Sequence, residues 1–167
     1  MKITLRPVSE SDDPFLSKLY ASTRAAEMAL VPWTDSQKEA FLEMQFRAQK
    51  TSYAKEYAGA QHAVISRDGD PVGQLYLDRS QDRFHILDIT VTDACRNQGI
   101  GSVVLSEILQ EANRADKPTT IYVENFNLSL RLFERLGFRV AAVKDFQILL
   151  ERRPGPLNGG AWEPVSA

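Results

Sequence analysis

Short strand-like segments recur along this chain, and helical segments separate them. A period of two between apolar residues, or a short apolar run bounded by turn residues, predicts a strand. Segments of this kind are residues 2–6, 61–67, 71–79, 84–91, 119–124 and 138–153, the last of which predicts one or two strands. Asp68-Gly69-Asp70 separates the second segment from the third and is typical of a hairpin turn.

Apolar residues at helical spacing, together with helix-capping residues, predict four helices. These helices span about residues 9–24, 35–57, 100–114 and 128–136. Thr34 or Asp35 can cap the second helix, and Asn127 can cap the last, which Gly137 can end. The order of elements predicts a mixed α/β fold with hairpins in its middle, because it lacks the regular strand–helix alternation of a doubly wound sheet.

Composition narrows the class of protein. A length of 167 residues with 43% apolar and 25% charged residues predicts one domain, over residues 1–151, followed by a Pro/Gly-rich tail over residues 152–167. The net charge is −2 and no basic cluster stands out, so we expect no nucleic-acid partner. No apolar run reaches the ~20 residues that span a bilayer. The N-terminus lacks the apolar segment of a signal peptide, and Cys95 is the sole cysteine, so we expect a cytoplasmic protein without a membrane partner.

The stretch RNQGIGS, residues 96–102, lies between a strand-like run and a helix. Glycine is destabilising within regular elements, so two glycines one residue apart require a reason. A helix N-terminus presents unpaired amides and partial positive charge, and glycines there let a phosphate approach the backbone. A phosphorylated ligand is one interpretation, and a tight turn that needs glycine only for its shape is the other. The motif alone leaves both open.

Two familiar nucleotide-binding loops fit this stretch poorly. A Walker A loop has a lysine directly after its last glycine, and no lysine follows Gly99 or Gly101. A dinucleotide-binding fingerprint has a third small residue at the position of Val104, although Glu124 lies at about the spacing expected of its acidic residue. A dinucleotide-dependent oxidoreductase is therefore disfavoured.

Two motifs resemble those of the GNAT N-acetyltransferase superfamily. The block ILDITVTDACRNQGIGSVVLSEILQEA is similar to its acyl-CoA-binding core, with the pattern [RQ]-x-x-G-x-[GA] at residues 96–101. The later block ENFNLSLRLFERLGF is similar to the family's segment that ends L-Y-E-K-x-G-F. The resemblance implies a mixed, mostly antiparallel sheet flanked by helices. It also implies an acetyl-CoA-dependent N-acetyltransferase that acts on a primary amine of a small molecule or a peptide. The alternative is a non-catalytic acyl-CoA-binding regulatory protein.

The resemblance also implies which residues bind coenzyme A. In the family, backbone amides of the glycine loop and the helix start hold the pyrophosphate. The matching residues here are Arg96, Asn97, Gln98, Gly99, Ile100, Gly101 and Ser102. The preceding strand of the family pairs with the pantetheine arm, which implies Ile89, Thr90 and Val91. Asn127 matches a position near that arm and can equally be a helix cap.

Asp88 and Glu124 are the candidate catalytic residues. Deprotonating an amine of pKa ~8–10.4 needs a base, and Asp88 is an acid within an otherwise apolar strand, next to the implied pantetheine segment. Asp88 could instead be a structural carboxylate, and Glu124, at a strand end, could be a solvated charge. Strand alternation places His85 on the face opposite Asp88, as a packing residue.

Phe133 departs from the family pattern, which has tyrosine there as the usual proposed proton donor to the thiolate. We expect Phe133 to pack in the core, and the general acid to be water or another side chain. For the amine acceptor, aromatic and amide side chains of the variable region are candidates, although each could be core or surface. These are Trp33, Gln45, Tyr53 and Tyr57. The sequence shows no metal-binding pattern, and the resemblance allows a homodimer.

Overall fold

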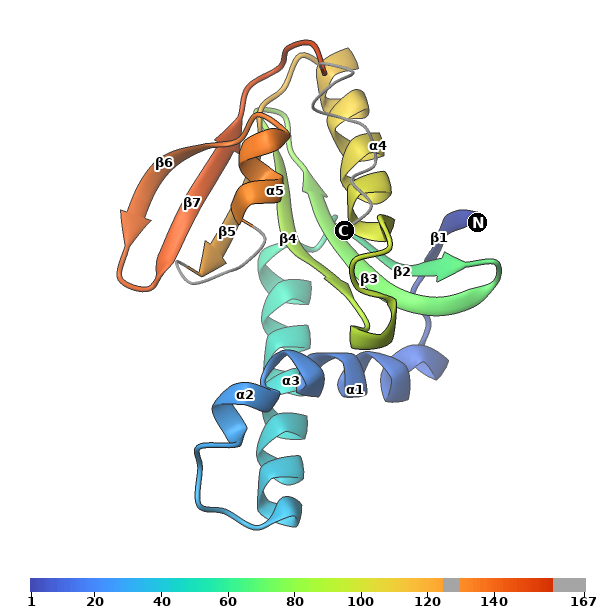
Figure 1. Cartoon of the computed structure of the whole chain (residues 1–167), viewed down its shortest axis with the longest axis vertical. Coiled ribbons are helices and arrows are strands. Elements are labelled where there is room, and N and C mark those ends of the chain that lie inside the picture. The colour runs from blue at the N-terminus through green and yellow to red at the C-terminus, as the bar shows by residue number, and fades with distance from the viewer. Residues whose placement is uncertain (125–129, 158–167) are drawn as a thin grey trace.

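A seven-stranded sheet in the order β1-β2-β3-β4-β5-β7-β6 forms the centre of the protein (Figure 1). The structure is a computed structural model that describes residues 1–124 and 130–157. The strands are β1 (Ile3–Pro7), β2 (Gln61–Arg67), β3 (Asp70–Arg79), β4 (Phe84–Val91), β5 (Thr119–Glu124), β6 (Arg139–Lys144) and β7 (Gln147–Arg152). Among the strands of the described residues, only β4 and β5 pair in parallel. The predicted mixed, mostly antiparallel sheet is therefore confirmed, and the last strand-like segment forms two strands.

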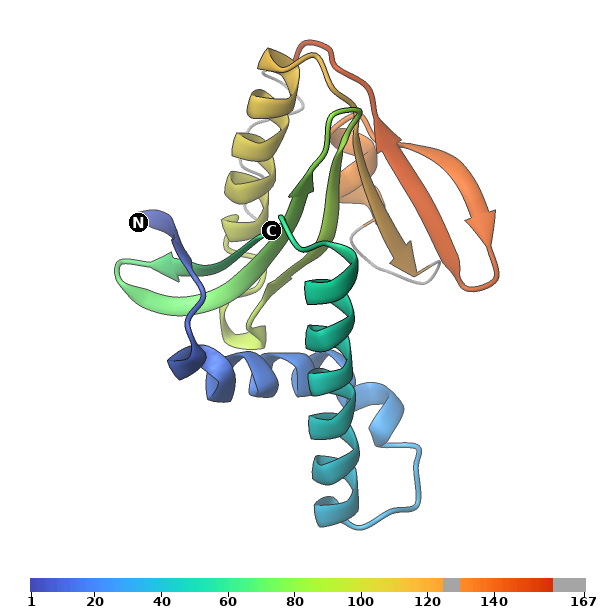
Figure 2. The same ribbon diagram turned by 180° about the vertical axis from the view of Figure 1, so that it is seen from behind.

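Helices cover both faces of the sheet. They are α1 (Asp13–Thr23), α2 (Ala25–Met28), α3 (Asp35–Glu56), α4 (Ile100–Arg114) and α5 (Leu130–Arg135), with short 3-10 turns at Glu10–Asp12 (η1) and Asp93–Cys95 (η2). Helices α4 and α5 lie on the face toward the viewer in Figure 1, and α3 lies on the opposite face, in front in Figure 2. The N-terminal half of α3, with α2, extends beyond the ends of the strands.

The main core lies between α4 and the sheet. One side of α4 is buried, from Ile100 through Val104 and Ile108 to Ala112, and it packs against apolar residues of β3, β4 and β5. Burying side chains of this size contributes ~1.5–3 kcal/mol each, which fixes α4 and the loop before it against the sheet. A smaller cluster of Leu16, Tyr20 and Phe46 joins α1 to α3.

The sheet forks between β4 and β5. Their parallel pairing covers only three positions, Phe84 to Ile86 against Thr119 to Ile121. Beyond Ile86 the two strands diverge, and the fork opens toward α1 and α3 (Figure 1). No described residue therefore pairs with the edge of β4 that faces β5 from residue 87 to 91.

A β-bulge at Leu87 changes which side chains share a face of β4. Asp78 pairs with His85 and Tyr76 pairs with Asp88, so β4 carries one more residue than β3 over this interval. Because Tyr76 and Asp78 lie on the same face of β3, His85 and Asp88 lie on the same face of β4. The prediction that they lie on opposite faces was wrong, since it assumed unbroken alternation.

Gly73 on β3 permits close packing against the open part of β4. A Cβ atom added at Gly73 would collide with the backbone carbonyl of Thr90, well inside van der Waals contact. We expect Gly73→Ala to lower the free energy of unfolding by about 1–3 kcal/mol, because β3 and β4 must separate to admit the methyl group.

Urea denaturation measures this loss, and Gly59→Ala is the matched control, because a Cβ at Gly59 meets nothing within 4 Å. The control should change stability by less than about 0.5 kcal/mol. Equal unfolding midpoints for the two variants would show that the strands are not so tightly apposed.

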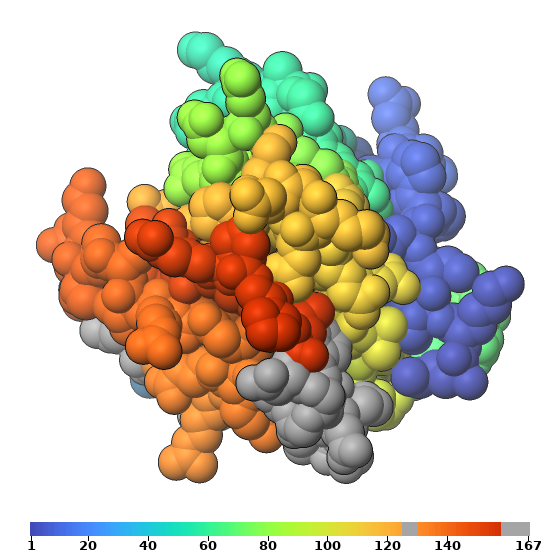
Figure 3. Space-filling view, turned by 90° about the horizontal axis from the view of Figure 1, so that it is seen from above, coloured from blue at the N-terminus to red at the C-terminus, as the bar shows by residue number. Residues whose placement is uncertain are grey.

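Residues just after β7 are attached to the C-terminal end of α4 (Figure 3). Strand β7 includes Arg152, which is one residue beyond the predicted domain boundary. Arg152 is 5% exposed and donates to the Leu136 carbonyl at 2.7 Å and to Asn113 Oδ1 at 3.0 Å. Asn113 also donates to the Gly155 carbonyl at 2.7 Å and accepts from the Gly155 amide at 3.1 Å. The predicted tail therefore begins with ordered contacts, and its residues 158–167 lie outside the described chain.

No helix within residues 1–124 and 130–157 combines the length and the apolar character needed to cross a membrane.

Candidate functional site

The glycine loop turns the chain sharply from β4 into α4. After η2, Arg96 is extended, with φ −67° and ψ 157°, and Asn97 has a left-handed φ of 61°. Gly99 has φ 81° and ψ 2° and is the N-cap of α4. Asparagine and glycine tolerate positive φ better than other residues, so this sequence suits the turn.

Backbone amides at the start of α4 are open. The amides of Ile100, Gly101 and Ser102 have no acceptor among the described residues, and the amide of Val103 is the first in the helix to bond, to the Gly99 carbonyl at 3.0 Å. A Cβ added at Gly99 or Gly101 would meet nothing within 4 Å. Free amides, a helix N-terminus and empty space beside two glycines together fit a phosphate group.

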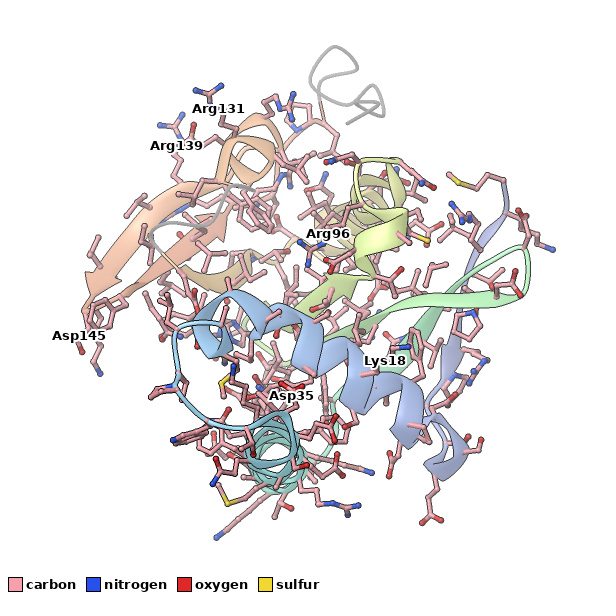
Figure 4. The ribbon with its side chains drawn as sticks, turned by 60° about the horizontal axis from the view of Figure 1, so that its bottom comes forward. Lys18, Asp35, Arg96, Arg131, Arg139 and Asp145 are labelled. Carbon is pink, nitrogen blue, oxygen red and sulfur yellow. The ribbon has the colours of Figure 1, made fainter. Side chains whose placement is uncertain are left out.

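Side chains around the loop hold it in place. The guanidinium of Arg67, at the end of β2, donates to Gln98 Oε1 and to Cys95 Sγ, the latter at 3.4 Å. Gln98 in turn donates to the Ala94 carbonyl at 3.2 Å. Arg96 pairs with Asp93 at 3.2 Å and lies beside the start of α4, whereas Arg131 and Arg139 point outward (Figure 4). The sequence reasoning did not anticipate Arg67, which is distant in the chain.

Asp88 is partly buried within a hydrogen-bonded chain on the fork. Gln74 Nε2 donates to Asp88 Oδ2 at 2.5 Å, and Thr90 Oγ1 donates to the two carboxylate oxygens at 2.9 and 3.0 Å. His62 Nε2 lies 2.8 Å from Gln74 Oε1, which extends the chain to β2. Burial raises the pKa of the Asp88 carboxyl, and its hydrogen bonds offset only part of that effect. Asp88 is therefore a stronger base than an ordinary aspartate.

Aromatic side chains from α3 cover this part of the sheet. Tyr53 lies edge-on to Tyr76, with ring centroids 5.1 Å apart, and Tyr57 stacks against His85 at 6.3 Å. Burial, with the nearby charge of Asp88, raises the pKa of Tyr53 to about 12. Burial also lowers the pKa of His85, so the imidazole is neutral at neutral pH. Two of the four predicted acceptor residues, Tyr53 and Tyr57, thus lie beside the Asp88 face of β4.

The other two predicted acceptor residues, Trp33 and Gln45, line a cavity of about 340 Å³ between α2 and α3. We call this the acceptor cavity, after the prediction that Trp33 and Gln45 bind the amine acceptor. Its lining includes Arg24, Glu27, Met28, Trp33, Phe41 and Gln45. The Trp33 and Phe41 rings meet edge to face, with centroids 5.2 Å apart, and form an apolar wall. Cavities of ~300–1,000 Å³ with apolar walls and few polar groups are typical of small-molecule sites.

Arg24 connects the acceptor cavity to the open end of the fork. It lies between α1 and α2, where φ −106° and ψ 0° break the single helix predicted over residues 9–24. Its Nη1 atom lies 3.3 Å from Glu27 Oε1 and 3.8 Å from Glu124 Oε1. Glu124, the second predicted catalytic acid, ends β5 and has a side chain that is 40% exposed. The sequence reasoning did not single out Arg24, because Glu27, three residues on, is an ordinary helical partner and Glu124 comes near only through the fold.

Two further predicted positions differ in outcome. Phe133 is 4% exposed and packs edge-on against Phe138, with centroids 5.4 Å apart, so the expectation that it is a core residue is confirmed. Asn127 lies outside the described residues.

Within residues 1–124 and 130–157, no group of three or more His, Cys, Asp or Glu side chains could hold a metal ion.

Comparison with known proteins identifies the family. The model of the acetyltransferase (GNAT) family matches residues 20–138, which is most of the chain. The chain belongs to this family, as the two sequence motifs predicted. A comparison with curated proteins gave no match.

Solved structures share the fold. The PaiA N-acetyltransferase of Thermoplasma acidophilum, in complex with coenzyme A, superposes with a TM-score of 0.70 at 15% identity, over 92% of this chain and 99% of that one. A GNAT acetyltransferase of Elizabethkingia anophelis with acetyl-CoA bound has a TM-score of 0.58 at 18% identity, over 90% and 97% of the two chains. The ribosomal-protein-S18-alanine N-acetyltransferase of Escherichia coli has a TM-score of 0.61 at 17% identity, over 95% and 97%.

Proposed function

We propose that this protein is an acetyl-CoA-dependent N-acetyltransferase that acetylates a primary amine. The observation that carries the proposal is the fork between β4 and β5, which opens directly beside the glycine loop at the start of α4. Family membership supports the same class of reaction.

Coenzyme A needs two kinds of contact, and this chain offers both. For the pyrophosphate, residues 96–102 supply the open amides and the space beside Gly99 and Gly101. For the pantetheine arm, which carries amide groups, the unpaired edge of β4 at Ile89, Thr90 and Val91 supplies backbone donors and acceptors.

Bound acetyl-CoA would supply an activated acetyl thioester. The chain's own task is then to orient the amine and to take its proton. Asp88 is suited to that task, because it adjoins the open edge of β4 and its pKa is raised toward that of a useful general base. Gln74 and Thr90 fix the carboxylate through hydrogen bonds. Glu124, on the other arm of the fork, is the second candidate.

Calorimetric titration with acetyl-CoA and coenzyme A, followed by a free-thiol assay over a panel of amines, tests the proposal. We expect micromolar or tighter binding, together with thiol release that depends on the amine. Protein that binds neither molecule would contradict the proposal. Protein that binds acetyl-CoA but acetylates no amine would instead be an acyl-CoA-binding regulatory protein, an alternative that the absence of a hydroxyl at Phe133 supports.

A further inference from the structure

We infer that the acceptor cavity binds an amine that also carries a carboxylate and an apolar group, as an apolar or aromatic α-amino acid does, with Arg24 binding the carboxylate. The inference rests on the proposed function and names the class of acceptor. Three features support this class of acceptor: the incomplete hydrogen bonding of Arg24, the apolar walls of the cavity, and the position of both relative to the fork.

Arg24 has unused capacity to bind an anion. Its Nε atom is buried and has no hydrogen-bond partner among the described residues. Its contacts with Glu27 and Glu124, at 3.3 and 3.8 Å, are longer than the ~2.7–2.9 Å of a good charge-assisted hydrogen bond. A buried donor without a partner is unfavourable, so such atoms usually bind water or a ligand. The Nε edge of a guanidinium can hold a carboxylate through two parallel hydrogen bonds.

The guanidinium is also held in position before any ligand binds. It lies over the ring of Tyr20, with Cζ 5.5 Å from the centroid, and Tyr20 OH lies 3.4 Å from Gln45 Oε1. A cation placed over an aromatic face loses less freedom when it binds an anion. The guanidinium of Arg24 is therefore preorganised to bind an anion at the cavity.

The walls of the cavity select an apolar group beside the carboxylate. Trp33 and Phe41 form one wall, and Met28 adds a flexible thioether side chain. The volume of about 340 Å³ suits a molecule of amino-acid size.

The geometry directs the amine of such a ligand toward the fork. Arg24 lies between the acceptor cavity and Glu124 on β5, so a carboxylate at Arg24 leaves the amine on the side of the two candidate bases. A polyamine is the competing class of ligand, because Glu27 and Glu124 outnumber Arg24 there and attract a second cation.

The test compares L-phenylalanine with L-phenylalaninamide, which lacks the carboxylate charge, and with spermidine, all with acetyl-CoA. We expect the free amino acid to have a kcat/KM at least ~10-fold higher than the other two, which is the order expected for one charge-assisted contact. Arg24→Gln should raise the KM for phenylalanine by roughly 10- to 100-fold and change that for the amide by less than about 3-fold. Arg24→Lys keeps the charge but loses the paired donors. Its KM for phenylalanine should therefore lie between those of the parent and Arg24→Gln.

A binding measurement gives a readout that does not need turnover. Phenylalanine titrated by calorimetry into the protein saturated with coenzyme A should bind the parent and bind Arg24→Gln at least ~10-fold more weakly. Arg47→Gln is the matched control, since Arg47 is exposed on α3, pairs only with Glu43 and lies outside the cavity lining. This control should leave both measurements unchanged.

Equal use of phenylalanine and its amide, a preference for spermidine, or equal binding of phenylalanine by parent and Arg24→Gln would overturn the inference. These outcomes differ from failure of the proposed function, in which acetyl-CoA does not bind or no amine on any panel is acetylated. In that case phenylalanine titrated by calorimetry into the parent and Arg24→Gln without coenzyme A still decides whether the cavity binds an amino acid.

Discussion

Replacing Gly101 with valine is expected to abolish measurable binding of coenzyme A while leaving the fold intact. A side chain at this position would occupy the space in which a phosphate would meet the open amides of α4, yet its Cβ touches no other part of the protein. Loss of two charge-assisted hydrogen bonds, each worth ~1.5–3 kcal/mol, predicts an affinity more than ~100-fold lower. Calorimetry with coenzyme A measures the loss.

Gly101 is a cleaner test than Gly99. Gly99 has φ 81°, so a valine there would also strain the backbone, and weaker binding could follow from a distorted loop. Gly59→Val provides the control, because a Cβ at Gly59 also meets nothing within 4 Å and the residue lies outside the loop. If the folded Gly101→Val variant bound coenzyme A as the parent does, the pyrophosphate would not lie at the start of α4.

Replacing Asp88 with asparagine is expected to lower kcat/KM by 10²- to 10⁴-fold, the usual contribution of a general base. The asparagine side chain can keep both contacts of the carboxylate. Its amide oxygen still accepts from Gln74, and its amide nitrogen can donate to the Thr90 hydroxyl. In the parent, kcat/KM should fall as the pH drops through the raised pKa of Asp88, and the variant should lack that fall. Steady-state rates across a pH series measure both effects, and Asp82→Asn, which alters an exposed acid in the connection between β3 and β4, is the control.

Asp88→Asn should keep or raise the stability of the fold, although it lowers activity. Since burial raises the pKa of Asp88 above its value in the unfolded chain, the folded state binds this proton more tightly, and that stabilisation is lost as the pH rises through the raised pKa. Above that pKa the ionised carboxylate therefore opposes folding, whereas the neutral amide of Asp88→Asn does not. A melting temperature equal to or above that of the parent is expected at pH 7. A marked drop in melting temperature, with unaltered kinetics at every pH, would make Asp88 purely structural.

The parts of the fold that sequence predicted well are those that local chemistry determines. Each strand-like segment formed a strand, because alternation and turn residues act over a few positions. The glycine loop was recognisable for the same reason, since the requirement for positive φ at Gly99 and for space beside Gly101 falls on the residues themselves.

The parts that sequence reasoning missed depend on neighbours far along the chain. One extra residue at Leu87 moved Asp88 to the face of His85, and an apolar residue in a buried strand gives no sign that it forms a bulge. Similarly, Arg24 is an unremarked arginine in a helical segment until α3 and β5 surround it. Gln74 and His62 became part of the Asp88 network only through the pairing of β2, β3 and β4.

The position of β7 in the sheet has a consequence for the order in which the chain folds during synthesis. β5 pairs with β4 at only three positions, and the other edge of β5 pairs with β7. β6 also pairs with β7. Both β5 and β6 must therefore wait for residues 147–152, which leave the ribosome after them, before their pairing is complete. Until then Ile121 and Val123 lack part of their cover, whereas β2 to β4 can pair first as a local meander. The arm of the fork that carries Glu124 is thus the last part of the site to form.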